Sequence, residues 1–178
     1  MTNYWVFKVT EEVGGLFLRS GIEIYNHRMQ DAFWGINLNQ EKTKTKAQQL
    51  EEGDHVVFYL VAKGHLNRFL GTAVLNSKLK NLDPDEAKNV VHKEFLDYES
   101  GVLLKSIDKW VNFVSVEDIR GKGIFASGKA FSQFFEGSIK KLKNQEEFNT
   151  IIQEYYLLKG LNNKQKSKQR PSQERRGK

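Results

Sequence analysis

The side chains that could catalyse a reaction are scattered along this sequence. The four histidines, at positions 27, 55, 65 and 92, show no spacing typical of metal ligands or of a catalytic base and its partner. The chain has no cysteine, which excludes disulfides, thiolate zinc sites and cysteine nucleophiles and is expected of a protein of the reducing cytoplasm. The sequence therefore predicts no catalytic residue, no metal site and no cofactor.

Phosphate-binding and hydrolase motifs are also missing. The segment from Gly121 to Lys129 has glycines and a lysine, but their spacing does not match a P-loop. No dinucleotide-binding glycine motif, zinc-protease motif or nucleophile-elbow motif occurs. The acidic pairs at 51–52 and 146–147 lie at an expected turn and an expected helix start, where carboxylates are common. We expect segment 121–129 to be a loop, and the sequence leaves open whether it contacts phosphate.

The elements that must position a binding site lack the regular alternation of a parallel doubly wound sheet. Aromatic and β-branched residues predict strands at residues 4–9, 55–62, 68–75, 101–107 and 111–116. Helices are expected at 21–30, from Asp83 and after Asn144, and the polar run 37–46 is expected to be a loop or a mobile helix start. The pattern predicts one α+β domain in which helices flank a mixed, mostly antiparallel sheet or small barrel.

Local signals fix several of these boundaries. Asp83, followed by Pro84 and Glu86, has the sequence of a capped helix start, and Asn144 with Glu147 repeats the cap before a buried helical face. The two strands at 55–75 are expected to form a hairpin, and Gly71 indicates a bulge or a close backbone approach in its second strand. The last helix is expected to pack on the sheet.

The positive charge of the chain belongs to its C-terminal end. Residues 161–178 contain seven Lys/Arg and one Glu, whereas residues 1–160 contain 21 of each sign. The end segment has no aromatic residue and cannot bury enough apolar surface to offset the entropy of ordering. We therefore divide the chain into a domain at 1–160 and a disordered basic tail at 161–178, which either attracts phosphates or only favours solubility. No apolar run is long enough for a membrane span, so no membrane partner is expected.

Three segments together resemble the EVE family of PUA-like domains, which share their fold with the YTH readers of methylated adenine in RNA. The first is Tyr-Trp-Val-Phe-Lys at 4–8. The second is Phe-Trp-Gly-Ile at 33–36, followed after a polar-rich stretch by the Gly-Asp turn and apolar strand at 53–59. The third is 102–119, and the helix start after Asn144 lies where these domains end. The resemblance covers most of residues 1–158 and implies a PUA-like fold.

The resemblance implies a noncatalytic pocket for one modified, usually methylated, base of DNA or RNA. Such a base leaves its stack and is held by aromatic faces and by polar groups at its edge. Trp34 matches the family's pocket tryptophan, and Gly35 and Ile36 would offer backbone groups to the base. Lys8 and Thr10 take the positions of a phosphate-contacting lysine and a polar base contact, with threonine replacing the usual asparagine.

The resemblance also implies contacts outside these two segments. Tyr98 lies about where related domains carry a second aromatic wall, usually tryptophan, so it would complete an aromatic cage. Ser127 and Lys129, in the glycine-rich segment, are expected to face the nucleic-acid backbone.

Other interpretations of the same residues stay open. Burial tendency places Trp5 and Phe7 in the core, and on composition alone Trp34 and Trp110 fit either a core or a pocket. Two alternative functions are an enzyme or accessory subunit of nucleic-acid modification or restriction, and a protein-interaction module. The sequence does not distinguish DNA from RNA, name the modification or give the oligomeric state.

Overall fold

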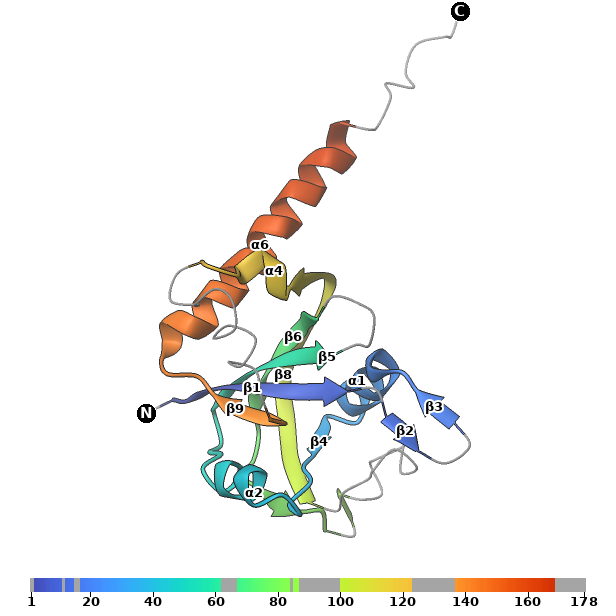
Figure 1. The fold of residues 1–178 in the computed structure, drawn as a ribbon, viewed down its shortest axis with the longest axis vertical. Coiled ribbons are helices and arrows are strands. Elements are labelled where there is room, and N and C mark those ends of the chain that lie inside the picture. Colours follow the sequence, from blue (N-terminus) through green and yellow to red (C-terminus); the bar gives the residue numbers. More distant parts are fainter. Residues whose placement is uncertain are drawn as a thin grey trace, which may run out of the picture.

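A curled sheet of seven strands forms an open half-barrel at the centre of the protein (Figure 1). The computed structural model describes residues 2–10, 12–14, 17–61, 67–83, 85–86, 100–122 and 137–168. The strands of the main sheet are β1 (Tyr4–Thr10), β4 (Phe33–Gly35), β5 (His55–Val61), β6 (Arg68–Leu75), β7 (Lys80–Asn81), β8 (Ser100–Ser115) and β9 (Ile139–Lys141). The helices are α1 (Gly21–Gln30), α2 (Glu41–Ala47), α4 (Val116–Ile119) and α6 (Gln145–Lys168), and β2 (Glu12–Gly14) pairs with β3 (Phe17–Arg19) apart from the main sheet.

The order of the strands confirms the predicted mixed, mostly antiparallel sheet. It runs β4-β8-β6-β5-β1-β9, and β7 also pairs with β8. Only the β1–β5 pair is parallel among the described strand pairs, and β5 and β6 form the predicted hairpin. The register shifts on both sides of Gly71, which confirms the predicted irregularity at this glycine.

Alternate side chains of the strands pack into two cores on opposite faces of the sheet. On β1, Trp5 and Phe7 enter the core shared with α1 and α2, whereas Val6 enters the core shared with α6. This alternation follows from the two-residue period of a β-strand. Trp5 and Phe7 are fully buried, as predicted, and Trp110 belongs to the second core, where its ring stacks on Tyr155 at a centroid distance of 4.4 Å.

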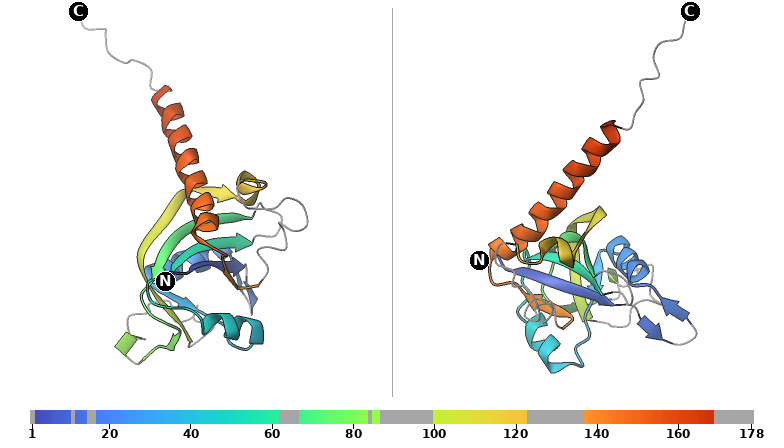
Figure 2. Two further views of the ribbon diagram at one scale, coloured as in Figure 1. Left: turned by 90° about the vertical axis from the view of Figure 1, so that its left-hand side faces the viewer. Right: turned by 45° about the horizontal axis from the view of Figure 1, so that its top comes forward.

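Both predicted helix caps are present. The Asp83 carboxylate accepts from the Glu86 backbone N–H at 2.8 Å, and the Glu86 carboxylate accepts in return from the Asp83 N–H. Asn144 Oδ1 accepts from the Glu147 N–H at 3.1 Å, and α6 begins directly afterwards. The first turns of α6 pack on the sheet, and the helix then runs away from it (Figure 2).

Three features of the structure differ from the sequence-based expectation. The two strands expected at 101–107 and 111–116 form one strand, β8, because β6 pairs with it on both sides of the expected junction. The run at 37–46, expected to be a loop or a mobile helix start, leads from Glu41 into helix α2, whose Thr43 and Ala47 are buried. Helix α6 continues to Lys168, so residues 161–168, which were expected to belong to the disordered tail, are helical. No helix in the described ranges is long and apolar enough to cross a membrane.

A buried carboxylate ties the start of β1 to the turn before β5. Asp54 is 1% exposed and accepts hydrogen bonds from Trp5 Nε1 at 2.8 Å, the Asn3 N–H at 2.9 Å and the Glu51 N–H at 3.1 Å. These donors, together with the Asn3 side-chain amide at 3.1 Å, compensate for the loss of hydration that burial of a carboxylate entails. Because these donors come from both segments, Asp54 fixes the beginning of the parallel β1–β5 pair.

Candidate nucleic-acid interface

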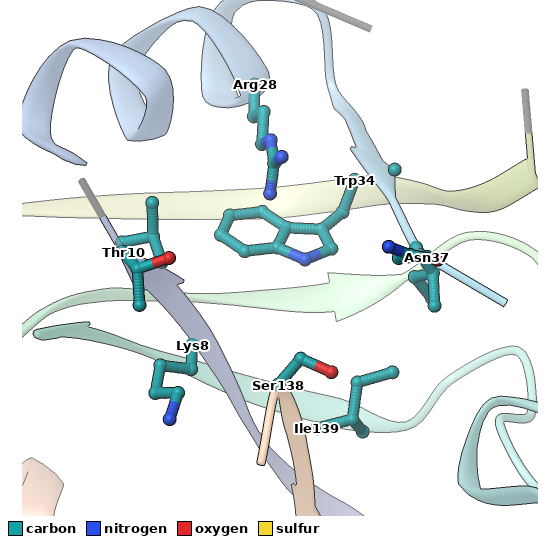
Figure 3. Close-up of a pocket in the computed structure, with 10 residues that line it drawn as sticks. Lys8, Thr10, Arg28, Trp34, Asn37, Ser138 and Ile139 are labelled. Carbon is teal, nitrogen blue, oxygen red and sulfur yellow. The ribbon is translucent and has the colours of Figure 1, made fainter. Parts of the chain in front are cut away.

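A cavity of about 100 Å³ lies beside Trp34, between β1, β4 and the start of β9 (Figure 3). This space is several times what one water molecule needs. Five of the predicted site residues line it, namely Lys8, Thr10, Trp34, Gly35 and Ile36. The other lining residues are Val9, Arg28, Asn37, Ser138 and Ile139. The predicted residues Tyr98, Ser127 and Lys129 lie outside the described residues.

Trp34 forms the aromatic wall of the cavity, but most of its ring is enclosed. Its side chain is 2% exposed, and its ring contacts Phe58 and Phe7 at centroid distances of 4.8 and 5.8 Å. The Arg28 guanidinium lies over the indole, 4.6 Å from its centroid. In Figure 3 this guanidinium points down onto the ring from α1. Trp34 is thus both a core residue and a wall of the cavity, and Arg28 covers it.

Helix α1 holds Arg28 in this position. The helix is capped by Ser20, whose hydroxyl accepts from the Glu23 N–H at 3.2 Å. On its buried face, the Tyr25 hydroxyl donates to the Leu70 carbonyl of β6 at 3.3 Å. Burial, together with the nearby Asp108 carboxylate, raises the pKa of Tyr25, so its hydroxyl keeps its proton. The helix therefore presents Arg28 to Trp34 from a fixed point on the sheet.

The lining of the cavity is rich in hydrogen-bond donors and carries positive charge. Lys8 and Arg28 are cationic, the hydroxyls of Thr10 and Ser138 can donate or accept, and no carboxylate is among the described lining residues. The backbone N–H of Ile36 donates to the Ser100 carbonyl at 2.8 Å. This N–H is therefore not available to a ligand, although a backbone contact from Ile36 to the base was expected. Such a lining suits a neutral polar ring attached to an anionic backbone.

Gly101 of β8 allows the strand that carries Trp34 to approach closely. The pair Gly35–Gly101 lies in the β4–β8 register, and a methyl group on Gly101 would collide with the Trp34 carbonyl oxygen and with the Phe33 ring. The first of these is a backbone atom and cannot rotate away. Glycine at 101 is therefore required for the position of Trp34.

The substitution Gly101→Ala is expected to lower the free energy of unfolding by at least about 2 kcal/mol, because either β4 or β8 must shift to accept the methyl group. Urea unfolding followed by circular dichroism measures this loss. Gly160→Ala is the matched control, since a methyl group there meets no atom within 4 Å. Equal stability of the two variants would contradict the close approach at Gly101.

Five residues of the cavity were not predicted from the sequence. Val9 lies between the predicted residues Lys8 and Thr10, and Asn37 directly follows Ile36, so both are adjacent in sequence to predicted positions. Arg28 comes from α1, and its charge on an otherwise amphipathic helix gives no sign of a ring contact. Ser138 and Ile139 come from beyond residue 136, and only the antiparallel pairing of β9 with β1 brings them to the cavity.

Comparisons with known proteins place the chain by its fold. No family model matches the sequence, and no curated protein matches it. A protein from Leishmania major has a solved structure that superimposes with a TM-score of 0.59, at 14% identity over 89% of this chain and 98% of that one. The human THYN1 protein, solved in complex with 5-methylcytosine-containing DNA, gives 0.58 at 14% identity over 86% and 98%.

A third solved structure is the YTH domain of the Zygosaccharomyces rouxii MRB1 protein in complex with N6-methyladenosine RNA. Its TM-score is 0.51, at 14% identity over 87% of this chain and 88% of that one. Each of these three structures covers between 86% and 89% of this chain. The chain therefore has the fold of these structures, which is the PUA-like fold that the sequence resemblance predicted.

Proposed function

We propose that this domain binds nucleic acid without catalysing a reaction, and that the cavity beside Trp34 holds one modified, methylated base. The observation that carries the proposal is the convergence of Lys8, Thr10 and Trp34, from two separate motifs, on one cavity. An aromatic wall offers stacking to any base, and the polar atoms around it provide the discrimination between bases. Lys8 and Arg28 supply positive charge next to the phosphates that flank an extruded base.

The proteins of similar fold support this class of ligand. One was solved with DNA that contains 5-methylcytosine and another with RNA that contains N6-methyladenosine. Both ligands present a methyl group on a flat ring, and burying a methyl group contributes about 0.8 kcal/mol. The shared fold and a cavity lined by the predicted residues together favour a modified-base reader over a protein-interaction module.

Binding requires Arg28 to move from the indole. Its guanidinium covers the ring on which a base would stack, and a cation–π contact is worth about 0.5–1 kcal/mol at an exposed site and about 2 kcal/mol when it is desolvated. Stacking of a base is worth about 1–3 kcal/mol, so the exchange is favourable only for a base whose stacking exceeds the contacts that Arg28 gives up. The displaced guanidinium then becomes available to a phosphate. Tyr98, if it forms the second wall, would close the cage around the base.

A binding panel tests the proposal. It comprises short single strands and duplexes of DNA and RNA that contain one 5-methylcytosine or one N6-methyladenine, each beside its unmethylated counterpart. We expect one methylated probe to bind about 5-fold or more tightly than its plain counterpart, because methyl burial of about 0.8 kcal/mol is supplemented by the fit of the cavity. Fluorescence anisotropy at two salt concentrations measures the affinities.

The preference for the methylated probe is expected to persist as salt weakens overall binding, because a buried methyl contact releases no counterions. Equal affinities across all pairs of probes at both salt concentrations would rule out the reader function. Release of a nucleotide or base from any probe would instead support the enzyme alternative.

A further inference from the structure

Segment 138–140 is shared between the cavity and helix α2. Ser138 and Ile139 line the cavity, and the Ser138 hydroxyl also forms a hydrogen bond of 2.9 Å with the Thr43 hydroxyl of α2. The Lys46 ammonium donates to the Ile139 carbonyl at 3.0 Å. Helix α2 therefore lies directly behind the wall of the cavity that β9 provides.

Like charges are crowded on this helix and its neighbour. Lys42 and Lys46 are four residues apart on α2, a spacing at which equal charges face each other and destabilise a helix by about 0.2–0.5 kcal/mol. Burial, followed by the charges of Lys140 on β9 and of Lys42, lowers the pKa of Lys46. Within the described ranges, neither Lys42 nor Lys46 forms an ion pair with a carboxylate. By contrast, Lys78, Lys105 and Lys122 each pair with a glutamate.

We propose that Lys42, Lys46 and Lys140 form a basic ridge that carries the phosphate backbone of the strand whose base enters the cavity. This inference rests on the proposed function, because it assigns the path of that same ligand. The ridge is connected to the cavity through Ser138 and Ile139, and Lys8, which also lines the cavity, donates its backbone N–H to the Ser138 carbonyl at 2.9 Å. Phosphates along the ridge offset the mutual repulsion of the lysines. Within the described residues, no carboxylate pairs with Lys42 or Lys46.

The separate roles of the ridge and the cavity have a measurable consequence. Contacts to phosphates contribute affinity without regard to the base, whereas the cavity contributes the choice of base. Each phosphate contact to a single strand changes the slope of log affinity against log salt by about 0.7. Loss of three such contacts is therefore expected to reduce the slope by about 2.

The test compares two variants that lose the same net charge. One carries Lys42→Gln, Lys46→Gln and Lys140→Gln, and the control carries Lys78→Gln, Lys105→Gln and Lys122→Gln. The probes are a fluorescein-labelled single strand with one 5-methylcytosine and its unmethylated counterpart, titrated by anisotropy between about 50 and 200 mM salt. We expect the ridge variant to bind both probes about 10-fold or more weakly, with the reduced slope and an unchanged ratio between the probes. The control variant is expected to keep most of the slope.

The outcomes separate the ridge from the proposed function. An equal loss of affinity and slope in both variants, or an unchanged slope in the ridge variant, overturns the ridge. A wild-type protein that shows the slope without preferring any methylated probe overturns the proposed function, and the slopes of the two variants then decide whether the ridge binds phosphates. The double variant Lys42→Gln, Lys140→Gln keeps the hydrogen bond of Lys46 to Ile139, and a matching partial loss of slope in it shows that the effect does not come from misfolding.

Discussion

Replacing Trp34 with alanine is expected to abolish the preference for a methylated base while salt-dependent attachment to phosphates persists. The indole is the only aromatic side chain among the described residues of the cavity lining. Base stacking on an aromatic ring contributes about 1–3 kcal/mol, so affinity for the preferred probe is expected to fall about 5- to 150-fold. The plain probe is expected to lose less, and anisotropy titration of both probes measures the change in their ratio.

The packing of Trp34 calls for two companion variants. Its ring also contacts Phe58 and Phe7, so truncation leaves a void and costs about 3–5 kcal/mol of stability. Trp110→Ala is the matched control, because Trp110 is a buried tryptophan of the other core and lies outside the cavity lining. Thr10→Tyr keeps Trp34 and fills the mouth of the cavity from an exposed position. If Thr10→Tyr and Trp34→Ala both retain the preference for the methylated probe, the assignment of this cavity is wrong.

Replacing Asp54 with alanine is expected to lower the free energy of unfolding by about 4 kcal/mol. The carboxylate accepts from Trp5 Nε1, the Asn3 N–H and the Glu51 N–H, and its removal leaves the buried Trp5 donor without a partner. Hydrogen bonds to a charged group contribute about 1.5–3 kcal/mol each, and an unsatisfied buried donor costs about 1–3 kcal/mol. Urea unfolding monitored by tryptophan fluorescence measures the loss.

Two neighbouring substitutions test this explanation. Asp54→Asn preserves the shape but turns an amide group toward donors, so we expect about half the loss. Glu52→Ala removes an exposed carboxylate of the same turn, which pairs with Lys105 at 3.3 Å, and is expected to change stability by less than about 1 kcal/mol. A loss from Asp54→Ala no greater than that from Glu52→Ala would show that the buried carboxylate does not hold β1 to β5.

The parts of the fold that were predicted correctly depend on short-range chemistry. The caps at Asp83 and Asn144 need only a side chain and an N–H three residues away, and the β5–β6 hairpin needs two apolar runs joined by a short connection. Burial of Trp5 and Phe7 follows from the alternation of a strand that has a core on each face.

The parts that were missed depend on long-range contacts. Whether 101–116 is one strand or two is decided by β6, which pairs with both halves of β8 and accommodates its irregularities. Strand β9 has three residues, too few to show a period, and is defined by its pairing with β1. Helix α2 has a polar sequence and gains its stability from buried Thr43 and Ala47, which no local pattern distinguishes.

The residues of the candidate site likewise fall into two groups, those in continuous sequence motifs and those brought to the cavity by packing. Motif resemblance identified Lys8, Thr10 and Trp34 because each belongs to a continuous segment. It could not identify Arg28 or Ser138, because their roles arise from where α1 and β9 pack. The binding roles of all eight predicted site residues, and the cytoplasmic location, stay predictions.

The position of β1 between β5 and the edge strand β9 has a consequence for how the protein is made. Its partners β5 and β9 come from residues 55–61 and 139–141, so a ribosome has released most of the chain before the first strand has both neighbours. Pairing over such separations folds slowly, because the intervening loops must close first. Since Ser138 and Ile139 form one wall of the cavity, a nascent chain still lacking them has no cavity to offer a nucleotide. Under the proposed function, recognition of a base thus begins only when synthesis of the domain is almost finished.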